Sequence, residues 1–294
     1  MITFFQAIIL GLLQGVSELF PVSSLGHLVL FPWLFGWYGV VKAQSQAESY
    51  FLSFAVILHV ATAVALLVFY REAWVRIIKG FFRSVQSRKV DTADGKLAWL
   101  LIVATIPAGL FGVIFEHSLR THFAKPSSAI IFLFINGCIL LIGDRYQKKV
   151  HKQSGKLSAT TQNVSDKLTF KRAGIIGVAQ TSALFAGISR SGITMISGLM
   201  SGLSHEDAAR FSFLLATPII LGAGVYKLPD FFSHLDAGVR GQILAGGLVA
   251  GIAAYFTVRY LDKYFRDRDL KPFGIYCICA SLAMLALGLV RGHF

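Results

Sequence analysis

The sequence predicts an all-α, polytopic membrane protein with six transmembrane helices and two re-entrant helical hairpins. Hydrophobic residues make up 55% of the 294 residues and charged residues only 15%, and the mean hydropathy is +0.64. This composition is typical of a membrane protein and excludes an ordinary soluble domain. Six apolar runs are long enough to cross a bilayer, and two further apolar stretches are each interrupted by a polar turn.

The first polar turn interrupts the apolar N-terminal stretch. Residues 4–20 are mainly apolar but are interrupted by Gln14 and Glu18, Pro21 ends the run, and residues 28–37 are apolar again. Neither arm reaches the roughly 20 residues that a transmembrane helix needs. Irregular backbone at membrane depth is tolerated where it is buried in protein or lines a cavity, so we expect a re-entrant hairpin.

The remaining elements follow in two series of three spans. The predicted transmembrane helices are 51–70, 97–115 with a kink at Pro107, 129–143, 208–226, 243–261 and 273–290. Between the two series, residues 173–186 and 192–203 form the arms of a second predicted hairpin around Ser189, Arg190 and Ser191. The charged stretch 71–96 and the polar stretch 144–172 are predicted to be loops.

The order of a broken hairpin followed by three spans occurs twice. A shift of 166 residues lays Gln14 on Gln180 and Ser23 on Ser189. We therefore predict one integral membrane domain over 1–294, with repeat one at 1–146 and repeat two at 170–294. A basic cytoplasmic loop, 144–172, joins the two. Broken helices in inverted-topology repeats are a recurring membrane architecture.

The distribution of basic residues predicts the orientation. The segments 71–96, 144–172 and 259–272 would share one face and contain seven, eight and five Lys or Arg, whereas the opposite face contains six. Because basic residues mark cytoplasmic segments, both termini are expected outside. The first hairpin then enters from the outer face and the second from the cytoplasm. The net charge of +13 follows from this topology, and no nucleic-acid partner is needed.

The two polar turns contain the candidate site. An arginine at the centre of a membrane segment costs about 2.5–3.5 kcal/mol, so Arg190 is expected to have a function. Its guanidinium matches phosphate oxygens, and Glu18 is a candidate ligand of a divalent metal cation, Mg²⁺ or Ca²⁺. Ser24 supplies a hydroxyl and His27 an acid or base. Further residues expected to contact the bound group are Gln14, Ser23, Gly26, Ser189, Ser191, Gly192 and Thr194. A hydrolase within a bilayer should act on a lipid phosphate.

Structural roles remain alternatives for several of these residues. Glu18 can pair with an arginine for stability alone, and His59 is more often an interhelical hydrogen-bonding residue than a catalytic one. A transporter or flippase of lipid phosphates would suit inverted repeats equally. A purely structural scaffold leaves Glu18 and Arg190 without a role.

The motifs resemble those of the BacA/UppP undecaprenyl-diphosphate phosphatases. The resemblance rests on QGVSELFPVSSLGH at 14–27, LHVAT at 58–62, ATIPA at 104–108, GISRSGIT at 187–194 and GLSHEDAARFSFLLATP at 202–218. It implies removal of the terminal phosphate from undecaprenyl diphosphate in the bacterial cytoplasmic (inner) membrane, which recycles the lipid carrier for cell-wall synthesis. It also implies a divalent metal, a site reached from the outer face and a link to bacitracin resistance.

The resemblance also assigns roles to individual residues. Glu18 matches a glutamate tied to metal and catalysis, Ser24 and His27 a nucleophile and its partner, and Arg190 the phosphate-binding arginine. Some relatives have Glu at the position of Gln14, so a second carboxylate for the metal is missing here. The implied mechanism is attack by Ser24 assisted by His27, with direct attack by water as the alternative. Whether the chain acts alone or as a homodimer stays open.

Overall fold

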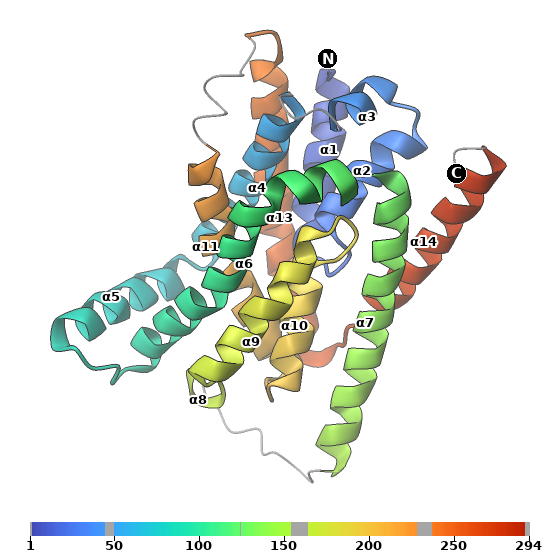
Figure 1. Ribbon diagram of the computed structural model, residues 1–294. Helices are drawn as coiled ribbons and strands as arrows, with labels where there is room; N and C mark the ends of the chain where they lie inside the picture. Colours follow the sequence, from blue (N-terminus) through green and yellow to red (C-terminus); the bar gives the residue numbers. More distant parts are fainter. Residues whose placement is uncertain (1, 45–49, 124, 154–163, 228–236, 292–294) are drawn as a thin grey trace.

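The computed structural model describes residues 2–44, 50–123, 125–153, 164–227 and 237–291, and these contain helices and no strands (Figure 1). Six helices are long and apolar enough to cross a membrane, which confirms the six predicted spans. They are α4 (Tyr50–Phe69), α6 (Ala93–Phe123), α7 (Pro126–Gln153), α11 (His205–Tyr226), α13 (Arg240–Asp267) and α14 (Lys271–Val290).

Shorter helices form the two predicted broken segments. The first contains α1 (Phe4–Ser17) and α2 (Ser24–Leu34), followed by α3 (Tyr38–Gln44). The second contains α9 (Phe170–Gln180), the 3₁₀ turn η1 (Thr181–Leu184) and α10 (Arg190–Met200). Two smaller elements, α8 (Val164–Lys167) and η2 (Ala237–Val239), precede α9 and α13. α1, α2, α9 and α10 are all too short to span a bilayer alone.

Serine residues begin the second helix of each pair. Ser23 Oγ accepts the Gly26 amide at the start of α2, and Ser189 Oγ accepts the Gly192 amide at the start of α10. These are N-caps, in which a side-chain oxygen satisfies one of the amides that the first helical turn leaves unpaired. The same cap therefore occurs at positions 166 residues apart.

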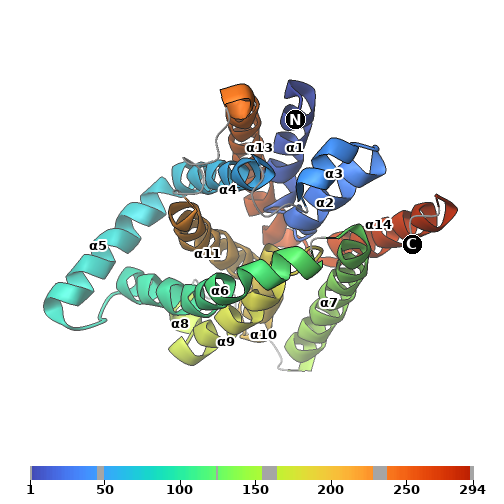
Figure 2. The ribbon, with the colours of Figure 1, turned by 45° about the horizontal axis from the view of Figure 1, so that its top comes forward.

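The expected loops are largely helical, which corrects the sequence-based prediction. Residues 71–87 form α5 (Arg71–Ser87), which packs against α6. Figure 2 shows this pair projecting from the body of the molecule. α7 continues past position 144 to Gln153, and residues 154–163 of the expected loop lie outside the described residues. Charged residues end a membrane span but not a helix, because the helix can continue into water with its own hydrogen bonds intact.

Small residues allow the short helices to approach the long ones. α1 packs on α13, and α9 packs on α6. A Cβ atom on Gly11 would lie 2.3 Å from the Gly246 carbonyl oxygen, and one on Gly177 would lie 2.5 Å from the Ala104 carbonyl oxygen. Only glycine permits backbones this close, as is common between membrane helices.

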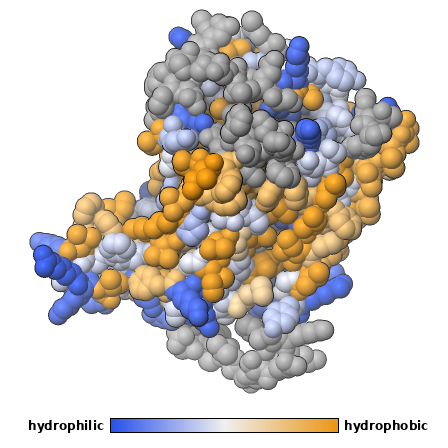
Figure 3. All heavy atoms as spheres, viewed as in Figure 1, coloured by the Kyte–Doolittle hydropathy of each residue, from blue (hydrophilic) through white to orange (hydrophobic). Residues whose placement is uncertain are grey.

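The outer surface of the helices is apolar over the middle of the molecule. Figure 3 shows hydrophobic residues in a broad belt, with hydrophilic residues at the tip of the α5–α6 pair and at the lower end. Ile114 on α6, Ile142 on α7 and Leu248 on α13 are each more than 65% exposed. Aliphatic side chains exposed on long apolar helices are expected to face lipid. The polar turns, by contrast, are buried inside the protein.

Candidate active site

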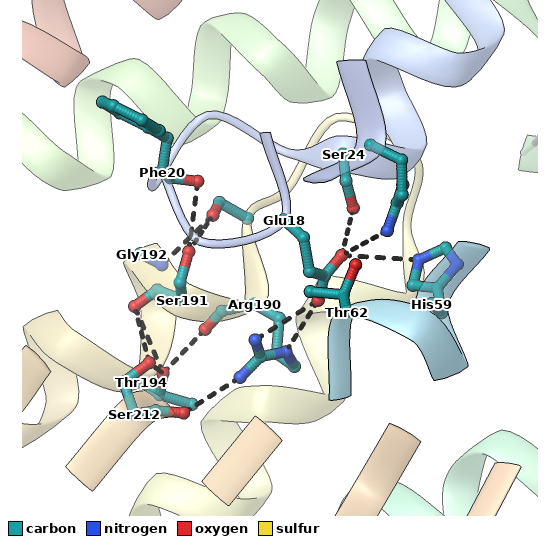
Figure 4. Close-up of polar contacts among 12 residues, drawn as sticks. Glu18, Phe20, Ser24, His59, Thr62, Arg190, Ser191, Gly192, Thr194 and Ser212 are labelled. Carbon is teal, nitrogen blue, oxygen red and sulfur yellow. Dashed lines mark hydrogen bonds and ion pairs between the residues drawn. The ribbon is translucent and has the colours of Figure 1, made fainter. Parts of the chain in front are cut away.

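The two polar turns meet through a buried ion pair (Figure 4). Glu18 follows α1, and Arg190 is the first residue of α10. Arg190 Nε and Nη2 donate to Glu18 Oε1 over 3.4 and 3.3 Å. The side chains are only 6% and 13% exposed, so each charge depends on the other for solvation. The structure thus brings together the glutamate and the arginine that the sequence places 172 residues apart.

The second oxygen of the Glu18 carboxylate has three polar neighbours. Ser24 Oγ donates to Glu18 Oε2 over 2.5 Å, and Gln14 Nε2 donates to it over 3.1 Å. His59 Nε2, from α4, lies 3.4 Å from the same oxygen. Because the Ser24 hydroxyl points at a carboxylate, Glu18 can receive its proton when Ser24 acts as a nucleophile.

His27, the predicted partner of Ser24, does not contact this serine in the structure. His27 Nδ1 lies 2.7 Å from the Ser23 carbonyl oxygen, and His27 Nε2 lies 2.7 Å from the hydroxyl of Tyr276 on α14. Both ring nitrogens therefore have partners other than Ser24, and the structure does not bring His27 to the serine. His59, whose other nitrogen lies 2.7 Å from the Ala55 carbonyl oxygen, is the histidine at the carboxylate.

The other predicted residues of the second turn mainly hold Arg190 in place. Ser191 Oγ donates to the Phe20 carbonyl oxygen over 3.2 Å, which ties α10 to the first turn. Thr194 Oγ1 donates to the Arg190 carbonyl oxygen over 2.8 Å and lies 2.6 Å from Ser212 Oγ. Arg190 Nη1 donates to the Ser212 carbonyl oxygen over 3.2 Å. Ser191 and Thr194 are fully buried, and their hydrogen bonds fix the start of α10, of which Arg190 is the first residue.

The glycines and Ser23 pack the two turns against each other. A Cβ on Gly26 would lie 3.0 Å from the Gly187 backbone, and one on Gly192 would lie 3.1 Å from a Leu140 methyl group. Ser23 Oγ accepts the Gly187 amide over 3.1 Å, in addition to capping α2. Ser23 has a φ of +69°, a left-handed conformation that is uncommon for a residue other than glycine. A strained residue at this junction is consistent with a functional site.

Asn136 on α7 is a residue of this region that the sequence reasoning missed. Its Nδ2 donates to the Pro21 carbonyl oxygen over 3.0 Å, and its Oδ1 accepts the Ser189 amide over 2.9 Å. One fully buried side chain thus joins the backbones of both turns. A lone asparagine in an apolar span was the available signal, because polar residues at membrane depth are costly and commonly functional.

The site opens into an apolar cavity of about 520 Å³. Glu18, Ser24, His59 and Arg190 contribute polar atoms to its wall. Most of the remaining wall is apolar and comes from α4, α6 and α11, including Phe51, Leu52, Val56, Val113 and Ile219. A polar cluster within an apolar chamber matches an amphiphilic ligand with a charged head and a hydrocarbon tail.

Comparison with known proteins identifies the family. The family described as Bacitracin resistance protein BacA matches residues 7–283. The chain belongs to the BacA family.

Individual relatives agree over nearly their whole length. An "Undecaprenyl-diphosphatase" of Mycolicibacterium paratuberculosis is 49% identical, with 97% of this chain and 98% of the relative covered. An "Undecaprenyl-diphosphatase 2" of Burkholderia thailandensis is 46% identical, with 95% and 94% covered. One of the same name from Frankia alni is 45% identical, with 94% and 95% covered. The similarity therefore includes both polar turns and every described transmembrane helix.

The residues around Glu18 can be tested against the divalent metal implied by the BacA resemblance. Within the described residues, no group of three His, Cys, Asp or Glu forms a closed metal site. However, Gln14 Oε1 is buried and has no hydrogen-bond partner in the part of the chain that the structure describes, while its Nε2 already donates to Glu18. A carboxylate with a free amide oxygen fits a hard cation that takes its other ligands from water and substrate phosphate.

Replacing Asn136 by leucine should loosen the junction between the turns. The change leaves the Pro21 carbonyl and the Ser189 amide unpaired, and each buried unpaired group costs about 1–3 kcal/mol. We expect the free energy of unfolding to fall by roughly 2–6 kcal/mol, measured by thermal or chemical unfolding in detergent. Ser281→Ala is the control, since this buried hydroxyl donates only to Ile278 of its own helix. Equal effects of the two changes would contradict the assignment.

Proposed function

We propose that this site hydrolyses undecaprenyl diphosphate to undecaprenyl phosphate and inorganic phosphate. The observation that carries the proposal is the Ser24 hydroxyl, which donates to Glu18 beside Arg190 at the wall of an apolar cavity. A nucleophile, a proton acceptor and a fixed cation are the groups that phosphoryl transfer needs. The names of the relatives support undecaprenyl diphosphate as the substrate.

The substrate would bind with its head between the turns and its tail among the apolar helices. Arg190 has a planar guanidinium that can contact two phosphate oxygens at once. The cavity of about 520 Å³ is of the size that holds a drug-sized ligand. An undecaprenyl chain is larger than such a ligand, so only its first isoprene units would enter and the remainder would lie in the bilayer.

The first chemical step is proposed to form a phosphoserine. Ser24 Oγ attacks the terminal phosphorus, and its proton passes to Glu18 Oε2, to which it already donates. The bond from that phosphorus to the bridging oxygen breaks, and undecaprenyl phosphate leaves with the electron pair. Arg190 stabilises the negative charge that develops on the terminal phosphate oxygens.

The second step hydrolyses the phosphoserine and regenerates Ser24. Water attacks the phosphorus of phosphoserine and the bond to Ser24 Oγ breaks. The leaving Ser24 Oγ takes back the proton that Glu18 received in the first step, and inorganic phosphate is released with the protons of the water. His59 Nε2 can exchange a proton with Glu18 across their 3.4 Å contact. His27, which the family resemblance pairs with Ser24, instead orients the start of α2 by bonding the Ser23 carbonyl and Tyr276.

The proposed metal cofactor belongs beside Glu18. Glu18 and Gln14 Oε1 would hold Mg²⁺ or Ca²⁺ together with substrate oxygens, and the cation would offset the charge of the diphosphate. With a single carboxylate, binding of the metal is expected to depend on bound substrate. Gln14 therefore sets how tightly the ion is held.

We further propose that the two turns belong to re-entrant hairpins in an inverted repeat. Gly11 of α1 and Gly177 of α9 lie 166 residues apart and make equivalent close contacts with long helices of the other half. The N-caps Ser23 and Ser189 have the same spacing. The basic tip of the α5–α6 pair and the lower end of α7 lie away from α1 and the end of α14 (Figure 1). This supports cytoplasmic placement of the basic end and access from the outer face.

Ser24→Ala should separate covalent catalysis from direct attack by water. If Ser24 is the nucleophile, phosphate release from undecaprenyl diphosphate by purified protein in detergent should fall by about 10³-fold or more. The control is Ser17→Ala, because Ser17 Oγ donates only to Leu13 of its own helix, 2.6 Å away. Near-normal turnover of Ser24→Ala would favour direct attack by water. Trapped phosphate on Ser24 in the wild-type protein would favour the covalent route.

Arg190 offers the test against a lipid-phosphate transporter, which the proposed inverted repeat also suits. We expect Arg190→Ala to lower phosphate release by at least about 10²-fold, since the transition state loses its fixed cation. Arg210→Ala, at an exposed position of α11, is the control. Movement of the lipid across liposomes without phosphate release by the wild-type protein would overturn the hydrolase and establish the transporter.

The metal proposal predicts opposite effects of two changes at Gln14. Gln14→Glu adds a second carboxylate and should lower the Mg²⁺ or Ca²⁺ concentration for half-maximal activity by about tenfold, whereas Gln14→Leu should raise it. The measurement is phosphate release after treatment with a chelator and titration with each cation. Full activity in the presence of the chelator would exclude a required metal.

A further inference from the structure

Gln180, the last residue of α9, is a buried polar side chain that the proposed mechanism does not use. It is 2% exposed and lines the same cavity as Glu18, Ser24 and Arg190. Neither its Oε1 nor its Nε2 has a hydrogen-bond partner within the part of the chain that the structure describes. An amide left unpaired in a buried position destabilises the protein, so its presence at a cavity wall points to a ligand.

The related position in the first half has a partner of its own. The 166-residue shift lays Gln14 on Gln180 and Glu18 on Leu184. Gln14 Nε2 donates to Glu18 one helical turn later, over 3.1 Å. The Leu184 side chain has no hydrogen-bond acceptor, and it lines the same cavity as Gln180. The second half therefore keeps the amide but lacks the carboxylate that satisfies it in the first half.

The surroundings of Gln180 restrict what the amide can bind. Ala183 and Leu184, which follow Gln180 in the chain, line the cavity with apolar groups. The Thr105 hydroxyl, also on the cavity wall, donates to the Leu101 carbonyl of its own helix over 2.8 Å. The amide is thus a polar group on a largely apolar wall. Its NH₂ group can donate to phosphate oxygens, and its oxygen can accept from a phosphate hydroxyl or a water bound to the ligand.

We propose that Gln180 binds the inner phosphate of the substrate, the one that stays on the lipid. This inference rests on the proposed hydrolase function. The proposed mechanism places the terminal phosphate at Glu18, Ser24 and Arg190, so another polar group of the cavity wall has to hold the inner phosphate. Gln180 is the cavity-lining side chain whose buried donor and acceptor both lack a partner among the described residues. Because the product keeps the inner phosphate, Gln180 contacts substrate and product alike, and the terminal phosphate does not touch it.

The test compares Gln180→Leu with wild type and with the control Thr105→Val, which also alters a cavity-lining side chain. We expect the KM for undecaprenyl diphosphate and the inhibition constant of undecaprenyl phosphate to rise together by about tenfold in Gln180→Leu. Inhibition by inorganic phosphate and kcat should change less than about twofold. Thermal stability without ligand should be kept or raised, because an unpaired polar group has been removed. Gln180→Glu, which keeps the shape and adds negative charge, should weaken product binding further.

Three results would overturn the assignment. Unchanged KM and product inhibition would mean that the amide binds only water. Weakened inhibition by inorganic phosphate, with product inhibition unchanged, would place Gln180 at the terminal phosphate. A large fall in thermal stability without ligand would mean that the amide is a packing element.

Failure of the hydrolase function itself would be recognised separately. If the wild-type protein releases no phosphate, stabilisation of its thermal unfolding by added undecaprenyl phosphate still measures binding of the lipid-linked phosphate. Loss of that stabilisation in Gln180→Leu, but not in Thr105→Val, supports the contact without any turnover. Equal stabilisation of all three proteins contradicts it.

Discussion

A buried ion pair between Glu18 and Arg190 joins the two polar turns. Both side chains are buried, and removing one partner of such a pair costs about 3–5 kcal/mol because the other charge is left unsolvated. Exposed pairs such as Arg71 with Glu72, which are 4.0 Å apart, contribute about 0–1 kcal/mol. Each turn therefore depends on the other to compensate its buried charge.

The surrounding hydrogen bonds hold that pair in one geometry. Ser191 and Asn136 donate to backbone carbonyls of the first turn. Thr194 donates to the Arg190 carbonyl, and the Ser212 carbonyl accepts from the Arg190 guanidinium. Gly26 allows the backbone of the second turn to approach closely enough for these bonds to form. Polar groups fixed before the substrate arrives need no rearrangement during the reaction, which is the basis of electrostatic catalysis. The same contacts bury the irregular backbone of the two turns in protein, away from lipid.

The long helices could be predicted from the sequence because hydropathy alone locates them. In lipid, a run of about 20 apolar residues satisfies its backbone hydrogen-bonding groups by forming a helix. Each of the six spans could therefore be located without tertiary information. The prediction of loops failed for segments that extend beyond the apolar runs. Residues 71–87 form α5, and α7 and α13 continue beyond their apolar runs to Gln153 and Asp267. Hydropathy marks the edge of the membrane, and amphipathic spacing is needed to recognise a helix beyond it.

Hydropathy was enough to predict the membrane class, the number of spans and the two polar turns, and the motifs indicated Glu18, Ser24 and Arg190. Which side chains share a site could be seen only in the folded protein. His27 lies three residues after Ser24 but contacts Tyr276, whereas His59 reaches Glu18 from α4. Asn136 and Gln180 acquire roles only from the turns and the cavity that they border. Local sequence determines which residues share a helix, but contacts between helices depend on packing across the whole chain.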